Sequence, residues 1–306
     1  MKKKVVKIGA VIVHYGDRSN TNECINSLLK NKDSNIDLKL YLVDNDSLNR
    51  FATEKNKNIK YFASNRNLGF SGGVNIGIKE ALKDKCSYIL LINNDAVIKK
   101  HFFKHLLPYF KIKNVGMVSP VITYYDNPEV IWCANGYLNK RFVYSTFPYM
   151  GKRLAEANLP DPIEADFGAA SLLVDSEVFR KIGFFKEKYF LYVEDVEFCL
   201  RAKKAGYRIV YSSKPLVLHK VSASAGIKGG NMLNSRAAFF YARNFFILIR
   251  DNRQSFNIIT AFIGQTFIRL PFYIFLRCAS LAAVFSYLRG YYFGLIYFLT
   301  GKLMSY

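Results

Sequence analysis

Between residues 5 and 123, apolar runs of strand length alternate with longer segments of helical periodicity. Alternation of this kind is typical of a mainly parallel sheet with helices packed on both faces. The sequence therefore predicts an α/β fold in this part of the chain. The predicted strands are 5–13, 38–44, 59–62, 88–92 and 115–123, and the predicted helices are 21–30, 71–83 and 101–110, the last broken near Pro108.

Polar side chains follow three of these predicted strands, at the point where each strand ends. In sheets of this class, ligands bind outside the carboxyl ends of the strands. We therefore expect these polar residues to lie at a binding site. They are His14-Tyr15 after the first strand, Asp44-Asn45-Asp46 after the second and Asn93-Asn94-Asp95 after the fourth.

The pattern is less regular from residue 123 to residue 165, a stretch rich in aromatic residues that contains the only tryptophan, Trp132. Regular periodicity returns at 167–183. A helix is then predicted from about residue 194 to residue 206, followed by a strand through 209–211 and by His219. The residues expected to be buried on that helix are Val196, Cys199 and Leu200.

The chain carries 44 lysines and arginines against 23 acidic residues, a formal net charge of +21. Such a balance favours an anionic partner, which can be nucleic acid, a phosphorylated substrate or acidic lipid. A solvated, lysine-rich surface fits the same composition. Charge alone therefore leaves the function class open.

The five cysteines are scattered, and none shows the spacing of a zinc site or of a CxxC motif. This pattern indicates reduced thiols in a cytoplasmic protein. The first residues are basic, but the apolar run that follows is short, contains Lys7 and lacks a small-residue cleavage site. The start of the chain therefore predicts a first strand and not a signal peptide.

Asp95 and His219 each have two interpretations. A strand-end Asp can cap the next helix. It can also hold Mg²⁺ or Mn²⁺, because such cations take one or two protein ligands while substrate phosphates fill other positions. His219 is either a structural residue or an additional ligand of that metal.

Three acidic residues, Glu194, Asp195 and Glu197, stand at the start of a predicted helix. Negative charge stabilises the positive end of a helix, so their role can be purely structural. Alternatively, one of the carboxylates accepts a proton from an attacking hydroxyl as a general base. The residues alone leave both interpretations open.

Residues 64–78 are rich in glycine and lead into a predicted helix. They match neither the Walker A pattern nor GxGxxG. Glycines such as Gly72 permit close approach of the backbone to a ligand, and the helix N-terminus favours an anion.

An ordered set of segments resembles the family 2 glycosyltransferases, in particular their rhamnosyltransferase-like and galactofuranosyltransferase-like members. The resemblance spans residues 6 to 225 and implies a GT-A fold, a Rossmann-like, mainly parallel sheet with flanking helices. The segments are VIVHYG, LVDNDS, NRNLGFSGGVNIGI, LLINNDAVI, FGAASLLVDSEVFRKIGFF, YFLYVEDVEFCLRAKKAGYRI and LHKVSAS.

The resemblance implies a role for each matching residue. Asp195 is expected to be the catalytic base, with Glu194 as its substitute. Asp95 is expected to bind the metal, with His219 as a second contact. The residues expected at the nucleotide-sugar donor are His14, Tyr15, Asp44 (on the nucleobase), Arg66, Asn67, Gly72, Asn94 and Asp95.

This chain departs from the family pattern at three of these places, one of which is the Glu194-Asp195 pair, where Glu194 is a possible substitute base. The metal motif reads Asn93-Asn94-Asp95 and has one carboxylate, and the first strand ends in His14-Tyr15-Gly16, where many members have Thr-Tyr-Asn. We expect the two amides to orient Asp95, or to meet the sugar, without adding charge.

The predicted function is an inverting glycosyltransferase, inversion being implied by the resemblance. The sugar passes from a nucleoside-diphosphate donor, of the dTDP-rhamnose or UDP-sugar class, to a hydroxyl of a lipid-linked or cell-surface glycan, and Mg²⁺ or Mn²⁺ stabilises the leaving diphosphate. Trp132 and Glu197 are expected to contact the acceptor. The sequence identifies neither the sugar, nor the nucleobase, nor the acceptor.

Two other classes stay open. One is a donor-binding protein without activity. The other is a basic nucleic-acid-binding protein, which explains the charge but not the acidic residues at strand ends, since these repel phosphates. No nucleic-acid partner is therefore expected.

After residue 234 the character of the chain changes. We expect a catalytic domain at 1–233 and a membrane-associating helical region at 234–306, which has eight lysines and arginines and the single acid Asp251. The segments 258–276 and 281–299 have nearly the length that spans a bilayer, but Arg269 and Arg289 lie in the middle of them. These segments are expected to be amphipathic helices on the cytoplasmic face of the cell membrane, with their arginines on anionic headgroups. Spanning helices and a homo-oligomer interface are the alternatives.

Overall fold

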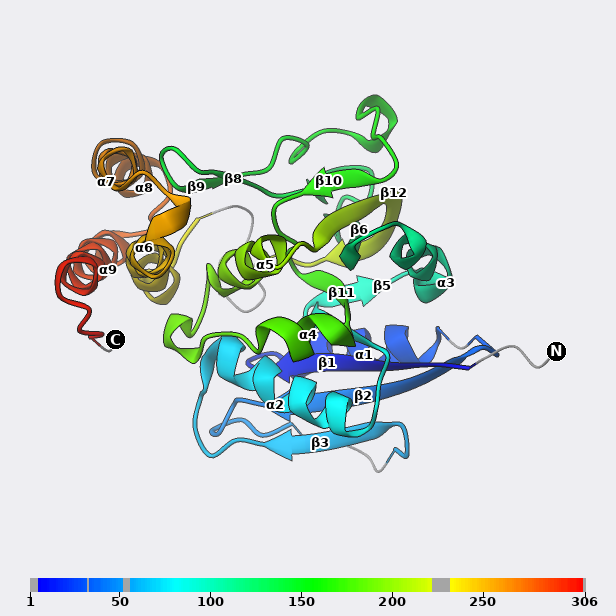
Figure 1. Ribbon diagram of the computed structural model, residues 1–306. Coiled ribbons are helices and arrows are strands. Elements are labelled where there is room, and N and C mark those ends of the chain that lie inside the picture. The colour runs from blue at the N-terminus through cyan, green and yellow to red at the C-terminus, as the bar shows by residue number, and fades with distance from the viewer. Residues whose placement is uncertain (1–4, 32, 52–55, 222–231, 305–306) are drawn as a thin grey trace.

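The protein was analysed as a computed structural model that describes residues 5–31, 33–51, 56–221 and 232–304. In these residues, ten strands form one mixed sheet in the order β10-β12-β6-β11-β4-β1-β2-β3, with β5 paired to β12 and β7 to β6 (Figure 1). The basic residues 1–4 and the end of the LHKVSAS segment, 222–224, lie outside the described residues.

The first half of the chain builds the parallel part of the sheet. In register, β1 pairs with β2 and with β4, so that His14 lies beside Asp44 and Val13 beside Asn93. The polar strand ends therefore meet along one edge, as the sequence predicts. The elements are β1 (Val6–His14), α1 (Arg18–Leu29), β2 (Ile36–Asp44), β3 (Ile59–Ala63), α2 (Gly69–Lys83) and β4 (Tyr88–Asn93).

The helices α1 and α2 cover opposite faces of this sheet. Because side chains alternate in direction along β1, each helix contacts a different set of them. His14 points to α1, where its ring contacts Thr21. Val11 and Val13 point to α2, where Gly77 and Gly73 leave room for them. The glycines of 69–77 thus allow the helix to lie close to the strand.

The second half extends the sheet with two parallel strands and one antiparallel strand between them and β4. The strand β12 runs parallel to β6, and β11 lies antiparallel to both β4 and β6. The helix predicted at 101–110 ends as an α-helix before Pro108 and continues as a 3₁₀ turn. The elements are β5 (Ala96–Ile98), α3 (Phe102–Leu106), β6 (Val115–Tyr124), β7 (Ile131–Cys133), β8 (Tyr137–Asn139), β9 (Tyr144–Thr146), β10 (Ile163–Ala165), β11 (Ser171–Asp175), α4 (Ser176–Ile182), α5 (Glu194–Lys204) and β12 (Arg208–His219), with 3₁₀ turns at Leu107–Lys111, Leu154–Glu156 and Glu187–Tyr189.

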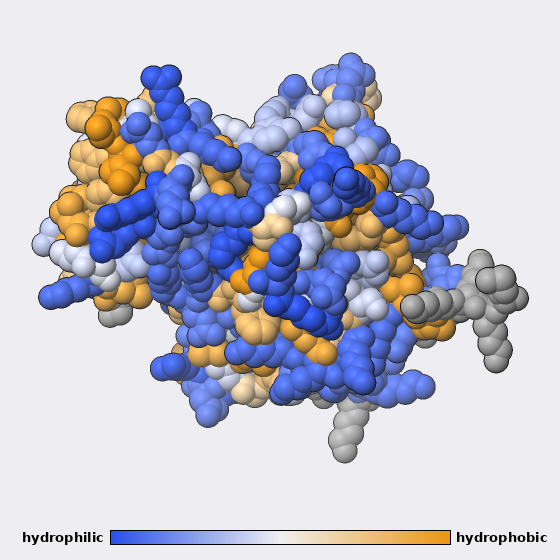
Figure 2. Space-filling model, viewed as in Figure 1, coloured by the Kyte–Doolittle hydropathy of each residue, from blue (hydrophilic) through white to orange (hydrophobic). Residues whose placement is uncertain are grey.

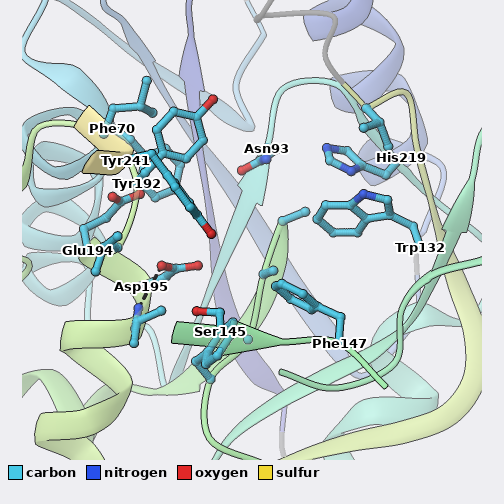
Figure 3. Close-up of a pocket in the computed structure, with 18 of the residues that line it drawn as sticks. Phe70, Asn93, Trp132, Ser145, Phe147, Tyr192, Glu194, Asp195, His219 and Tyr241 are labelled. Atoms are coloured by element: carbon cyan, nitrogen blue, oxygen red, sulfur yellow. Dashed lines mark hydrogen bonds between the residues drawn. The ribbon is translucent and has the colours of Figure 1, made fainter. Parts of the chain in front are cut away.

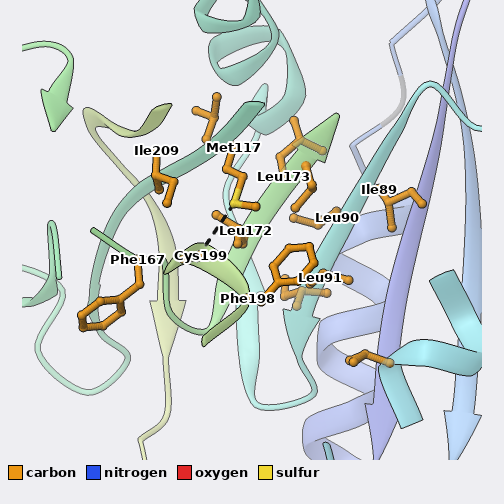
Figure 4. Packing of buried hydrophobic residues seen from close by; sticks show 14 of the residues in the cluster. Ile89, Leu90, Leu91, Met117, Phe167, Leu172, Leu173, Phe198, Cys199 and Ile209 are labelled. Carbon is orange, nitrogen blue, oxygen red and sulfur yellow. Dashed lines mark hydrogen bonds between the residues drawn. The ribbon is translucent and has the colours of Figure 1, made fainter. Parts of the chain in front are cut away.

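The main core includes residues from both faces of the sheet, and one part of it lies between the sheet and α5 (Figure 4). The apolar residues of β4 and β11 meet there with Phe198 and Cys199, and the Cys199 thiol lies 3.8 Å from the sulfur of Met117. Val196 and Leu200 are buried on the same helix, which confirms the face predicted from the sequence.

The C-terminal tail, residues 234–304, packs against the rest of the molecule through α6. This helix contributes Phe245, Ile247 and Leu248 to the main core. The helix α9 lies against α6, and a Cβ at Gly290 would meet the Phe239 carbonyl oxygen at 2.2 Å, so glycine permits the close contact. The elements are α6 (Ser235–Asp251), a 3₁₀ turn at Arg253–Ser255, α7 (Ile258–Ile263), a π-helical segment at Gly264–Arg269, α8 (Leu270–Leu276) and α9 (Leu281–Thr300).

The two long tail helices predicted from the sequence are present, but the arginine of the first has a different position from the one expected. Arg269 is 3% exposed and lies 3.6 Å from the centre of the Phe245 ring, with its Nη1 donating to Gln265. It faces the protein and cannot reach lipid headgroups. The division at residue 233 stays a prediction, although α6 and the catalytic part share one core.

Candidate active site

A pocket of about 490 Å³ opens at the carboxyl edge of the sheet. Figure 3 shows Trp132 and His219 on one side of it, Glu194 and Asp195 on the other, and Asn93 at the strand end between them. The pocket therefore brings together residues from β4, from β12 and from the start of α5, which lie far apart in the sequence.

Asp95 and His219 meet on one side of the pocket. The Nε2 atom of His219 lies 3.1 Å from the Oδ1 atom of Asp95, and both side chains are buried. Strand pairing produces this contact, because β5 runs antiparallel to β12 and places Ala96 opposite His219. Although burial favours the protonated acid, His219 and Lys220 lower the pKa of Asp95 below its usual value.

These two residues suit a divalent cation with few protein ligands. A carboxylate oxygen and an imidazole nitrogen point to one place in the pocket, and Trp132 packs its ring 4.3 Å from that of His219. Within the described ranges, no group of three or more His, Cys, Asp or Glu side chains could hold a metal. Substrate oxygens or water would have to fill the other positions, as is common for Mg²⁺.

Glu194 and Asp195 begin α5 on the opposite side of the pocket. Burial raises the pKa of Glu194 well above its usual value, and the neighbouring Asp195 raises it further. Burial also raises the pKa of Asp195, to about 6, although the Val196 N–H opposes the change. Both carboxyl groups therefore keep their protons to a higher pH than free carboxylic acids do, and either is a candidate to accept a proton near neutral pH.

A model of the family described as Glycosyl transferase family 2 matches residues 10–182, which is more than half of the chain. The chain belongs to glycosyl transferase family 2. The resemblance noted in the sequence is therefore confirmed.

Two curated relatives of this family member have names that state an activity. One is the low-salt glycan biosynthesis hexosyltransferase Agl10 of Haloferax volcanii, 28% identical over 152 residues, covering 49% of this chain and 48% of the relative. The other is the N-acetylglucosaminyl-diphospho-decaprenol L-rhamnosyltransferase of Mycobacterium tuberculosis, 41% identical over 69 residues, or 22% of each chain. The matches thus span less than half the length of these relatives.

The fold of this glycosyltransferase is also found in a solved structure, that of GalNAc-T7 with UDP, GalNAc and Mn²⁺. The TM-score is 0.54 at 13% sequence identity, and the match covers 72% of this chain and 44% of the other. The predicted GT-A fold, a mostly parallel sheet with flanking helices, is therefore confirmed.

Of the residues expected at the donor, Asp95 lines the pocket and the others lie outside its lining. His14, Tyr15 and Asp44 stand at the ends of β1 and β2. Asp44 is fully buried and accepts hydrogen bonds from the Asp46 N–H, the Phe51 N–H and the Tyr61 hydroxyl. Because the side chain is fully buried, a neighbouring group would have to move before a nucleobase could reach it. His14 is also fully buried, and burial lowers its pKa despite the nearby carboxylates of Asp44 and Asp46.

Three further expected donor residues are more accessible. Arg66 is exposed, and Asn67 is half-buried with its Oδ1 accepting from the Gly69 N–H at the start of α2. The Tyr15 hydroxyl accepts a hydrogen bond of 2.7 Å from Arg236 of the tail. The donor role of these residues remains a prediction.

Two further residues expected at the donor, Asn94 and Gly72, contact other parts of the protein. Asn94 donates to the Thr21 hydroxyl at 3.0 Å and so connects the turn after β4 to α1, whereas Asn93 lines the pocket. A Cβ on Gly72 would meet the Cβ of Leu68 at 2.7 Å, so glycine allows the close approach of Leu68 at the start of α2. The donor role of both residues remains a prediction.

Glu197, which was expected at the acceptor, does not reach the pocket. Its side chain is fully buried, outside the pocket lining, and forms ion pairs with Arg201 at 2.9 Å and Lys186 at 2.7 Å. The structure therefore gives it a structural role. Trp132 does line the pocket, as predicted for an acceptor contact.

The sequence did not predict that residues of the tail line this pocket. Helices α6 and α8 contribute an aromatic wall, and the residue after α8 contributes one cation. No sequence signal could have identified them, because aromatic residues occur all around these helices. The tail residues that line the pocket are Tyr241, Phe245, Phe272, Tyr273 and Arg277.

Proposed function

We propose that this glycosyltransferase is an inverting enzyme that moves a sugar from a nucleoside-diphosphate donor, of the dTDP-rhamnose or UDP-sugar class, to a hydroxyl of a lipid-linked or cell-surface glycan. One observation carries the proposal: a single pocket holds the Asp95–His219 pair on one side and Glu194–Asp195 on the other. A hexosyltransferase and a rhamnosyltransferase among the relatives support the reaction class.

Asp195 is the proposed general base. It accepts the proton of the acceptor hydroxyl while the hydroxyl oxygen attacks the anomeric carbon of the donor. The bond from that carbon to the diphosphate oxygen breaks, and the diphosphate leaves with the electron pair. Attack from the face opposite the leaving group inverts the anomeric configuration.

Asp95 and His219 are the proposed ligands of Mg²⁺ or Mn²⁺. When bound, the cation would neutralise the negative charge that develops on the departing diphosphate. The donor set fits this role, since a carboxylate and an imidazole face each other at 3.1 Å in the pocket. The Mn²⁺ in the GalNAc-T7 structure agrees with such a requirement.

The acceptor is proposed to enter from the tail side of the pocket. Phe272 lines the pocket and is also 43% exposed, so the pocket continues into the outer surface of α8. Arg277, at the end of the same helix, offers positive charge for the phosphate of a lipid-linked acceptor. Trp132 offers an aromatic face for a sugar ring.

The tail is proposed to hold the enzyme as a peripheral protein on the cytoplasmic face of the cell membrane, on anionic lipid. Figure 2 shows apolar side chains gathered over α7, α8 and α9. Among the most exposed are Ile259, Phe267 and Phe275, at 72%, 70% and 80%. Ile258–Leu276 is long and apolar enough to span a membrane, but its Arg269 side faces the protein, so the helix suits the membrane surface. A homo-oligomer through this face is the alternative outcome.

A panel of nucleotide sugars tests the proposed function. Thermal shift of the full-length protein, with and without Mn²⁺, should identify the donor, and donor hydrolysis should then show turnover. Donor binding without hydrolysis or transfer to any glycan acceptor would instead indicate a binding protein. Tight, salt-sensitive binding of DNA or RNA with no donor binding would indicate the nucleic-acid class.

A further inference from the structure

The loop that leads into the proposed base has an unusual backbone. Phe190, Tyr192 and Val193 have φ angles of 63°, 67° and 70°. A positive φ is uncommon outside glycine and is a true outlier for a β-branched residue such as valine. Such a conformation persists only when surrounding contacts determine it. We call residues 188–193 the base loop.

Asn244 of α6 provides the first set of these contacts. Its side chain is fully buried, and its Nδ2 atom, with two hydrogens to donate, lies within hydrogen-bond distance of three carbonyl oxygens of the base loop. The distances are 2.7 Å to Tyr189, 2.8 Å to Leu191 and 2.8 Å to Tyr192. One amide group thus binds carbonyl groups before and after Phe190 in the base loop.

Arg243 provides the second set. It is 3% exposed, and its Nη2 atom lies 2.9 Å from the carbonyl oxygen of Lys188 and 3.3 Å from that of Tyr189. Its Nε donates to the Asn244 side-chain oxygen at 3.0 Å, which orients the amide with its nitrogen toward the loop. Arg243 and Asn244 therefore act as one unit.

The other side of the base loop rests on α2. The Ser71 N–H lies 3.3 Å from the Phe190 carbonyl oxygen, and a Cβ on Gly69 would meet that oxygen at 2.3 Å. The Phe190 ring stacks on Phe240 of α6 at 4.8 Å. The loop is therefore held between the helix that begins at the expected donor site and the tail.

We propose that α6 is a positioning element for the catalytic base, in which Asn244 and Arg243 hold the base loop so that Asp195 points into the pocket. The inference rests on the proposed function of Asp195. It gives the tail a role in turnover that is separate from membrane attachment. Neither residue touches the pocket, so both act through the loop.

The chain offers a matched control for Asn244. Gln265 is also a buried tail amide, 2% exposed, whose oxygen accepts from an arginine and whose nitrogen donates to carbonyl oxygens. Its acceptors are Phe142 and Val143, at 3.1 and 2.7 Å, in the turn between β8 and β9. Asn244→Asp and Gln265→Glu each keep the shape of the side chain and remove the donor.

The test compares both variants as full-length proteins. Asn244→Asp is expected to lower kcat about 100-fold, the cost of a misplacement near 1 Å, while the donor KM changes less than about threefold. Gln265→Glu is expected to keep kcat within about threefold of the unmodified protein. Hydrogen exchange of residues 188–193 should become faster only in Asn244→Asp.

Three outcomes would overturn the inference: a folded Asn244→Asp variant with unchanged kcat, an equal loss of kcat in both variants, or base-loop exchange that is the same in both. If Asn244→Asp does not fold, Asn244→Ser takes its place, because serine keeps one donor. Its kcat is expected to lie between those of Asn244→Asp and the unmodified protein. An unchanged kcat in Asn244→Ser would also refute the inference. If the unmodified protein turns over no donor at all, the proposed function fails, while hydrogen exchange still decides how the loop is held.

Discussion

The two sides of the pocket are built in different ways. Asp95 and His219 are placed by strand pairing, since β5 and β12 put Ala96, the residue after Asp95, opposite His219 at the edge of the sheet. Glu194 and Asp195 follow a loop with three positive φ angles, whose carbonyl groups are bound by side chains of the tail. We call Asp95 and His219 the metal side of the pocket, and Glu194 and Asp195 the base side, after their proposed roles. The position of the metal side thus depends on main-chain hydrogen bonds between strands. The position of the base side depends on residues more than 40 positions away in the chain.

The difference also appears in charge. Asp95 lies beside a histidine and a lysine that favour its ionised form, whereas Glu194 and Asp195 are buried next to each other, and no cation among the described residues lowers their pKa. The proposed roles need this difference, since a metal ligand must be ionised and a base must take up a proton.

The largest effect is expected from removing the base. Asp195→Asn should lower kcat by about 10²–10⁴-fold, the usual contribution of general-base catalysis, with donor affinity close to normal because the amide keeps the shape. Steady-state kinetics with donor titration by calorimetry checks this. Glu194→Gln should have a smaller effect, and the reverse ranking would identify Glu194 as the base. Two mild effects would mean that these acids only stabilise the helix start.

The metal side should respond differently. Asp95→Ala is expected to lower kcat by about 10²–10³-fold, as loss of an electrostatic stabiliser does, and also to weaken donor binding, because a metal bridges the protein and the diphosphate. His219→Ala should have the same effects less severely. Activity measured over a Mn²⁺ series is the readout. Near-normal activity of Asp95→Ala with unchanged metal dependence would show that the cation is not held there.

The two sides should affect stability with opposite signs in metal-free protein. Asp195 has a pKa raised to about 6 by burial, so its ionisation opposes folding as pH rises from 4 to 6 and above. Asp195→Asn should therefore be more stable than the unmodified protein at pH 8, by up to about 3 kcal/mol, and the gain should vanish near pH 4.

Asp95 provides the contrast for this prediction. Its pKa is lowered in the folded state, so its charge adds stability above its unfolded pKa, and this stability is lost as pH falls. Asp95→Asn should thus be less stable than the unmodified protein at pH 8. Urea unfolding with a chelator at both pH values measures the difference, and a loss of stability in Asp195→Asn at pH 8 would contradict it.

The smallest effect is expected from single changes on the outer tail face. Phe275→Glu should weaken binding to vesicles that contain anionic lipid by about tenfold, because one exposed aromatic ring no longer enters the interface. Leu48→Glu is the control, since Leu48 is 99% exposed but lies in the catalytic part. Vesicle sedimentation gives the affinity. Equal effects of the two changes, or a shift in oligomeric mass with Phe275→Glu alone, would favour another use of this face.

Much of this architecture follows from local sequence. The strands that end in polar residues, the break near Pro108 and the buried face of α5 are set by hydrophobic period and by proline geometry, which act over a few residues. The tail helices 258–276 and 281–299 follow from their length and apolar content in the same way. Asp95, Asp195 and His219 were likewise found from the ends of predicted elements, and the structure places all three in one pocket.

Other features depend on contacts between distant segments, which a local pattern does not contain. Arg269 looks like a headgroup ligand in the sequence, yet it is buried against Phe245 and Gln265. Gly72 and Asn94 match positions in a binding motif, and only the structure shows that Gly72 lies against Leu68 at the start of α2 and that Asn94 donates to Thr21 of α1. Glu197 belongs to the acidic cluster, yet Lys186 and Arg201 hold it away from the pocket.

The sequence by itself determined which segments become strands and helices and which acids stand at their ends, because periodicity and turn chemistry are local. Only the tertiary structure decided which of those acids share a pocket and what holds them there. The base loop shows the reason. Its left-handed residues are unfavourable on their own, and they are held by Asn244 and Arg243, whose role no property of residues 234–251 reveals until α6 is packed beside the loop.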